Sequence, residues 1–69
     1  MEEVIQLVQS ELEVNNGDIL YSDFLEKVSF PLRQYIPRAM REMKSRGIAT
    51  RQNVLNADDG SVTLHIKAL

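Results

Sequence analysis

The sequence predicts an α+β fold in which three helices precede a C-terminal β-hairpin, with a short strand between the first two helices. Apolar residues recur at helical spacing in residues 2–14 and 32–47, and they alternate with polar residues in 62–69. Asparagine, glycine or proline interrupts the pattern between these segments. Because the chain has 69 residues, we expect residues 1–69 to form one domain with a thin core.

Residues 2–14 are expected to form the first helix, which Asn15-Asn16-Gly17 ends in a left-handed turn. Glu2 and Glu3 lie in its first turn, where the helix dipole favours negative charge. We assign this helix to the scaffold, because its acidic outer face would repel nucleic acid. The residues that share its apolar face are Val4, Ile5, Val8 and Leu12, with Leu7 at the edge.

Residues 18–21 are expected to form a short strand that lies beside the later hairpin as its third strand. Ser22 or Asp23 then caps a second helix that extends to about Val28, and Asp23 with Glu26 has the spacing of a capping box. This helix is short and depends on its neighbours. Its apolar residues are Phe24, Leu25 and Val28.

The connection to the third helix contains Phe30 and Pro31. A proline disfavours the helical conformation of the residue before it, so we expect Phe30 to be extended. Its ring would then fill the corner between the second and third helices.

The third helix lies within residues 32–47, LRQYIPRAMREMKSRG, and Gly47 ends it. Pro37 permits two starts. The helix begins near Arg33 or Gln34, which leaves Pro37 in the first turn, or Pro37 is itself the first helical residue. We favour the first start, because the apolar residues before Pro37 keep helical phase with those after it.

The hairpin is expected to pair residues 48–55 with residues 62–69, which alternate in polarity. Asp59-Gly60 suits a two-residue type I′ turn. In that register the facing pairs are Leu55 with Leu64, Ala57 with Val62, and Val54 with His65.

The net charge of −2 conceals an asymmetry along the chain. Residues 1–28 contain seven acidic side chains and one lysine, whereas residues 33–69 contain seven basic and three acidic side chains. Either the two halves attract each other and are solvated, or an anionic partner approaches the C-terminal half.

The residues do not form a catalytic set, so we expect a protein that is not an enzyme and has no cofactor. There is no cysteine, and the single histidine, His65, has no nucleophile to activate. Asp58-Asp59-Gly60 lacks the spacing of a calcium loop, and the three glycines form no phosphate loop. Met40 and Met43 fall at the core phase of the third helix.

The other face of the third helix carries long hydrogen-bond donors and no acid. The side chains opposite its apolar stripe are Gln34, Arg38, Arg41 and Ser45. Arginine can donate two hydrogen bonds to guanine, and glutamine can bond adenine in the same two-pronged way. Cations that flank this face can neutralise phosphates, and they are Arg33, Lys44, Arg46, Arg51 and Lys67. The hairpin tip at residues 56–61 carries two acids and should avoid phosphate.

Two stretches carry a likeness to a known family: residues 21–28 as the second helix, and residues 36–49 as the third helix that leads into a hairpin. With these elements the whole chain resembles the winged helix-turn-helix family. The resemblance implies that the third helix enters the major groove and that the hairpin, or wing, touches the flanking backbone. It also implies that Gln34, Arg38, Arg41 and Ser45 face the bases. Pro37 and the acidic wing tip depart from the family pattern.

The sequence therefore predicts a double-stranded DNA-binding domain, a small transcriptional regulator or the N-terminal module of one. The alternative is a winged helix that binds proteins, which the negative net charge and the acidic tip favour and which would expose an apolar patch. Tight specific binding would need a homodimer, so the chain is either a dimer through the first helix or a monomer that binds weakly. The first helix is also the expected surface for another protein partner. No apolar run of about 18 residues predicts a membrane span, and the acidic N-terminus is unlike a signal peptide. We expect a cytoplasmic (nucleoid-associated) or nuclear protein that is not secreted.

Overall fold

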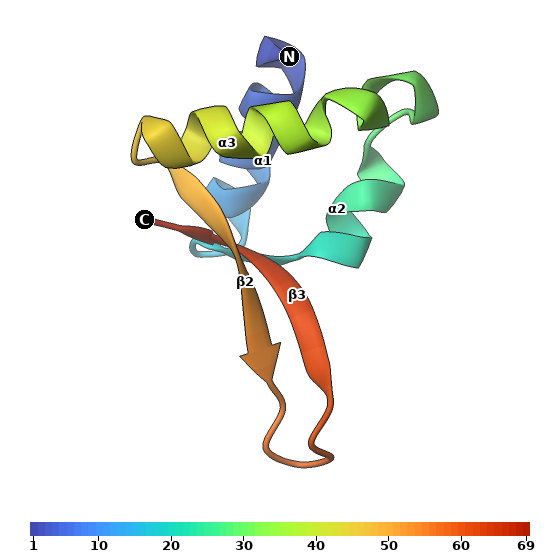
Figure 1. Ribbon diagram of the computed structural model, residues 1–69, viewed down its shortest axis with the longest axis vertical. Coiled ribbons are helices and arrows are strands. Elements are labelled where there is room, and N and C mark those ends of the chain that lie inside the picture. The colour runs from blue at the N-terminus through green and yellow to red at the C-terminus, as the bar shows by residue number, and fades with distance from the viewer.

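The computed structural model describes residues 1–69 as three α-helices, one 3-10 helix and a three-stranded antiparallel sheet. The expected α+β fold with three helices is confirmed at this level. In Figure 1 the helices gather at one end of the molecule and the hairpin extends away from them. The elements are α1 (Glu2–Val14), β1 (Asp18–Leu20), α2 (Tyr21–Lys27), η1 (Phe30–Tyr35), α3 (Ile36–Ser45), β2 (Ala49–Leu55) and β3 (Val62–Ala68).

The sheet has the order β1-β3-β2, so the last strand of the chain is the central one. β1 pairs antiparallel with β3, with Ile19 opposite Ile66, and both side chains are buried. The expected short strand beside the hairpin is confirmed, although it ends at Leu20 and not at Tyr21. This third strand covers the base of the hairpin and joins it to the helices.

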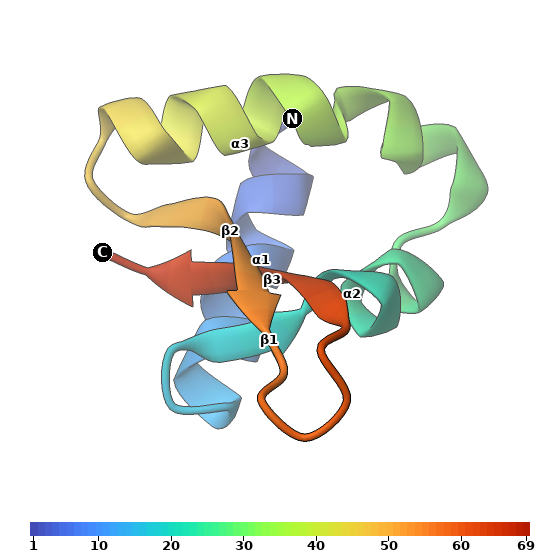
Figure 2. The ribbon, with the colours of Figure 1, turned by 60° about the horizontal axis from the view of Figure 1, so that its bottom comes forward.

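The core lies between the base of the sheet and the three helices. In Figure 2 α3 lies above the strands, and α1 lies behind them. The four residues predicted to be the buried face of α1 are buried, and so are Met40 and Met43 of α3. The buried residues are Val4, Ile5, Val8, Leu12, Ile19, Phe24, Val28, Ile36, Ala39, Met40, Met43, Ala49 and Ile66.

α2 begins at Tyr21, and the predicted cap at Ser22 or Asp23 is wrong. The N-cap is Leu20, which has extended dihedral angles and makes no side-chain capping bond. Strand β1 continues directly into the helix, so the cap position falls on the last strand residue. Phe24 and Val28 are buried as expected, and Leu25 is half-buried.

Phe30 does not fill a corner between helices, as the sequence had suggested. It begins η1, and 81% of its surface is exposed. The backbone N–H of Leu32 donates to the carbonyl of Ser29 at 2.9 Å. This bond closes a tight turn that contains Phe30 and Pro31. The turn keeps Phe30 from the extended conformation that would direct its ring toward the core.

α3 begins at Ile36, so neither of the two expected starts is correct. Arg33 and Gln34 belong to η1, which runs directly into α3. Pro37 is in the first turn, where its missing N–H loses no intrahelical hydrogen bond. Leu32 is half-buried and packs on the core, so η1 keeps the apolar phase that favoured an earlier start.

The end of α3 is the predicted one and sets the direction of β2. Gly47 has φ +73°, its N–H donates to the carbonyl of Lys44 at 3.1 Å, and the N–H of Ile48 donates to that of Met43 at 2.8 Å. These two bonds form a Schellman motif, which turns the chain sharply at a glycine. β2 therefore leaves directly beneath the last turn of α3.

The hairpin has a wider loop than expected, and its predicted register is wrong by two residues. The N–H of Asn56 donates to the carbonyl of Ser61 at 2.7 Å, and residues 57–60 connect this pair. The N–H of Gly60 returns to the carbonyl of Asn56 at 2.8 Å, so Asp59-Gly60 is not an isolated two-residue turn. A shift of two residues leaves each side chain on its expected face. The observed partners are Leu55 with Val62, Asn53 with Leu64, and Gln52 with His65.

Candidate nucleic-acid interface

The structure divides the eight lysines and arginines according to whether a carboxylate neutralises them. Three have acidic partners: Lys27 pairs with Glu11, Arg46 with Glu2 and Glu42, and Lys67 with Asp18. The five without an acidic partner within 4.0 Å are Arg33, Arg38, Arg41, Lys44 and Arg51. Residue type alone did not distinguish these two groups in the sequence.

Arg46 serves as a link between α1 and α3. Its Nη2 lies 3.0 Å from Glu2 Oε1, and its Nε lies 2.9 Å from Glu42 Oε1. Hydrogen bonds to Glu2 and then to Glu42 raise the pKa of Arg46 above its ordinary value. Two carboxylates already compensate its charge, so the structure offers less support for Arg46 as a phosphate ligand.

Arg33 is directed toward the end of α2. Its Nη2 donates to the carbonyl of Leu25 at 2.8 Å, and its Nε donates to that of Val28 at 3.3 Å. Its guanidinium also lies 5.7 Å from the centre of the Phe30 ring. Gln34 is exposed and bonds the carbonyl of Pro31 at 3.1 Å. Arg33 therefore ties η1 to the end of α2, where the carbonyl of Leu25 also accepts the backbone N–H of Val28 at 3.2 Å.

Arg41, Lys44 and Arg51 come together around one hollow between α3 and β2. It has a volume of about 270 Å³, and Met40 and Thr50 complete its wall. Arg51 lies with its guanidinium 6.0 Å from the centre of the Tyr21 ring, at the outer limit of a cation–π contact. The three cations share this hollow with no carboxylate among its lining residues.

The remaining predicted residues lie at different distances from this hollow. Arg38 and Ser45 are exposed on α3, and Arg38 makes no ion pair. Lys67 is 3.7 Å from Asp18 Oδ2, on the side of the sheet where β1 lies. Thr50 was not a predicted site residue, because a threonine in a strand carries no signal of its own.

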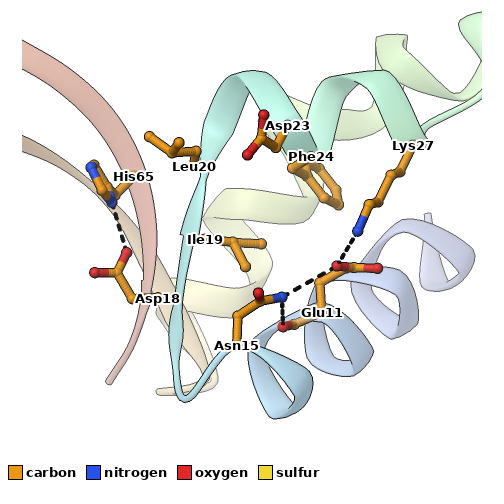
Figure 3. Close-up of a pocket in the computed structure, with 9 residues that line it drawn as sticks. All are labelled: Glu11, Asn15, Asp18, Ile19, Leu20, Asp23, Phe24, Lys27 and His65. Atoms are coloured by element: carbon orange, nitrogen blue, oxygen red, sulfur yellow. Dashed lines mark hydrogen bonds and ion pairs between the residues drawn. The ribbon is translucent and has the colours of Figure 1, made fainter.

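A second hollow lies between α1, β1 and α2 and has the opposite character. Its volume is about 440 Å³, and Glu11, Asp18 and Asp23 line it together with Lys27 and His65. Figure 3 shows Lys27 directed to Glu11 and His65 directed to Asp18. This hollow is acidic and internally paired, so an anionic partner is not favoured there.

The His65–Asp18 contact links β3 to β1 through side chains. Asp18 Oδ1 accepts from His65 Nδ1 at 2.7 Å, and His65 Nε2 lies 3.0 Å from Thr63 Oγ1. The hydrogen bond from His65, and then the charges of His65 and Lys67, hold the pKa of Asp18 below its ordinary value. The histidine is therefore a structural partner of β1. No three His, Asp or Glu side chains are grouped so that they could hold a metal ion.

Comparison of the chain with protein families, with curated proteins and with solved structures finds no match. None of its helices combines the length and hydropathy that a membrane crossing requires. Any functional interpretation therefore depends on the geometry of the chain itself.

Proposed function

We propose that the chain is a winged helix-turn-helix module that binds double-stranded DNA. In this interpretation α2, η1 and α3 are the helix-turn-helix, and the β2–β3 hairpin is the wing. The observation that carries the proposal is the group of cations without an acidic partner on α3 and the adjoining strand. Four of them are exposed, and they are Arg38, Arg41, Lys44 and Arg51.

The outer face of α3 supports major-groove readout. A groove about 12 Å wide admits one helix, and exposed arginines on that helix can reach base edges. Arg38 and Arg41 are the side chains for this role, and Ser45 follows them on the same face. Gln34 would contact the duplex only from η1, before the α-helix begins.

The hollow between α3 and β2 supports contact with the sugar-phosphate backbone. Lys44 and Arg51 enter it from two elements, so a phosphate there would fix the position of the helix relative to the wing. The wing tip contains Asp58 and Asp59 and would stay away from the phosphates. We therefore propose that the base of the wing, and not its tip, meets the duplex.

The test is a fluorescence anisotropy titration of a random duplex at several salt concentrations. We expect binding that weakens steeply with salt, and we expect Arg38→Ala with Arg41→Ala to weaken it at least about tenfold at low salt. Glu13→Ala, an exposed change on α1, is the control and should not weaken binding. No retention of duplex at low salt, or equal binding by the double variant, would refute the proposal.

A protein-binding winged helix remains the second candidate, and exposed apolar side chains favour it. Phe30 is 81% exposed, and Leu55 and Val62 of the hairpin are 69% and 60% exposed. On α1, which the sequence had suggested as the surface for a protein partner, Val14 is 79% exposed. An NMR titration with duplex separates the candidates, because DNA binding should shift residues 33–51.

A further inference from the structure

Strand β2 has one free edge. β3 occupies its other side, and Figure 1 shows no element beside the outer edge of β2 along the hairpin. The N–H of Leu69 donates to the carbonyl of Ile48 at 3.1 Å, and the N–H of Asn56 donates to that of Ser61 at 2.7 Å. In an antiparallel ladder such bonded positions alternate. The backbone groups of Arg51, Asn53 and Leu55 therefore point outward, away from β3.

Opposite charges lie at the two ends of this edge. At its base, the hollow with Arg41, Lys44 and Arg51 extends around the edge, because Thr50 and Arg51 lie on opposite faces of the strand and both line it. At its tip, Asp58 and Asp59 are exposed and make no ion pair. Asp59 accepts the backbone N–H of Ser61 at 2.9 Å.

We propose that two copies of the chain pair antiparallel through their β2 edges. This direction brings the acidic tip of each hairpin to the basic hollow of the other copy. With Asn53 opposite its own counterpart, Arg51 faces Leu55, and Asp58 lies level with Ile48, directly after α3. Both contacts occur twice because the pair has two-fold symmetry.

The antiparallel direction also avoids repulsion between like charges. At about 3.4 Å per residue, the two Arg51 positions would be about 14 Å apart along the strands, which is beyond the Debye length at physiological salt. The exposed side chain of Leu55 would gain the aliphatic stem of Arg51 as a cross-strand neighbour.

A second copy fits this edge because the chain itself carries both halves of the charge pattern. The spacing between tip and hollow is the same in each copy. In the antiparallel pair each acidic tip therefore meets the basic hollow of the other copy, and the same residues make the contact at both ends. The surface covered is narrow, and we expect a weak dimer that salt dissociates.

The same hollow is assigned to a DNA phosphate in the proposed function. One consequence rests on the proposed function. The dimer and the duplex compete for Lys44 and Arg51, so self-association would hold the protein in a form that binds DNA less well. The dimer itself does not depend on DNA binding.

Sedimentation equilibrium at low salt, without DNA, tests the pairing. The wild-type chain should show a monomer–dimer equilibrium, and Asp58→Lys or Lys44→Glu alone should raise its dissociation constant about tenfold. The chain that carries both changes should recover part of the affinity, because it restores one pair of opposite charges between positions 58 and 44, with the signs exchanged. Glu13→Lys, on α1, is a matched control for the change of net charge in Asp58→Lys.

Asn53→Pro provides a second variant that tests the backbone pairing. It removes an outward N–H and no hydrogen bond to β3, so the hairpin should keep its NMR spectrum while the dimer is lost. A wild-type chain that stays monomeric at millimolar concentration overturns the proposal. So does a dimer that persists in Asn53→Pro, or one that Asp58→Lys and Lys44→Glu leave unchanged. Because no DNA is present, these outcomes leave the proposed function untouched.

Discussion

The two sides of this small protein use the same residue types in different ways. On the side of α1 and β1, Lys27 and Lys67 each lie against a carboxylate, and Arg46 reaches across to Glu2. On the outer side of α3 and β2, Lys44 and Arg51 have none. A cation without an internal partner keeps its charge available for another molecule, whereas a paired cation mainly joins elements of the fold.

The largest effect on duplex binding should come from removing two cations that have no acidic partner. Lys44→Ala with Arg51→Ala should weaken duplex binding about tenfold at low salt and lower the salt slope by about two. Lys27→Ala with Lys67→Ala removes the same formal charge from the paired side and should change affinity by about twofold or less. Anisotropy titrations between low and physiological salt measure both.

Equal losses in the two double variants would mean that net charge, and not pairing, governs binding. A loss confined to the Lys27 and Lys67 variant would place the DNA on the opposite side of the molecule.

The periodicity of the sequence was enough to predict the helices and the faces of the hairpin, and the short apolar stretch at residues 18–21 predicted the third strand. It could not predict η1, because a 3-10 helix and an α-helix bury similar apolar positions over one or two turns. The hairpin register depends on how Asn56 and Ser61 close the loop, and alternation is unchanged by a two-residue shift. Phe30 was misplaced because its exposure depends on the turn around Pro31.

The sequence was enough to predict the residue types of the candidate site, but not which of its cations lack an acidic partner. Arg38 and Arg41 follow from the polar stripe of α3. The acidic partners of Arg46 and Lys67 include Glu2 on α1 and Asp18 on β1, which are distant in the sequence. Only the packing of α1 and β1 against the rest of the chain reveals these pairs.

The next largest effect is on stability and concerns the glycines that follow α1 and α3. Gly17 has φ +83° and Gly47 has φ +73°, so alanine is strained at both. A Cβ at Gly17 would lie 3.3 Å from the Cβ of Ala68, whereas one at Gly47 would meet nothing within 4 Å. We expect Gly17→Ala to lower the free energy of unfolding by about 2 kcal/mol and Gly47→Ala by about 1 kcal/mol. Urea denaturation measures both, and a greater cost at Gly47 would contradict this ranking.

A smaller effect is expected for Arg46→Ala, which removes the link between α1 and α3. Both of its ion pairs are exposed, so the change should lower the thermal midpoint less than either glycine variant. Duplex affinity should change by about twofold or less, in contrast to the Lys44 and Arg51 variant. A loss of binding as large as in that variant would show that Arg46 exchanges its carboxylates for phosphate.

The smallest effect concerns the pH dependence of the paired side. The hydrogen bond from His65 lowers the pKa of Asp18 in the folded chain. The ionised carboxylate therefore stabilises the fold at pH values above the pKa that an aspartate has in the unfolded chain, about 4. That stabilisation is lost as the pH falls through the lower, folded pKa. Asp18→Asn should therefore destabilise the protein at pH 5, and its deficit relative to wild type should shrink toward pH 2. Urea denaturation across this range measures the deficit. A deficit that stays constant would mean that Asp18 titrates alike in the folded and unfolded chains, and that His65 holds β1 by geometry alone.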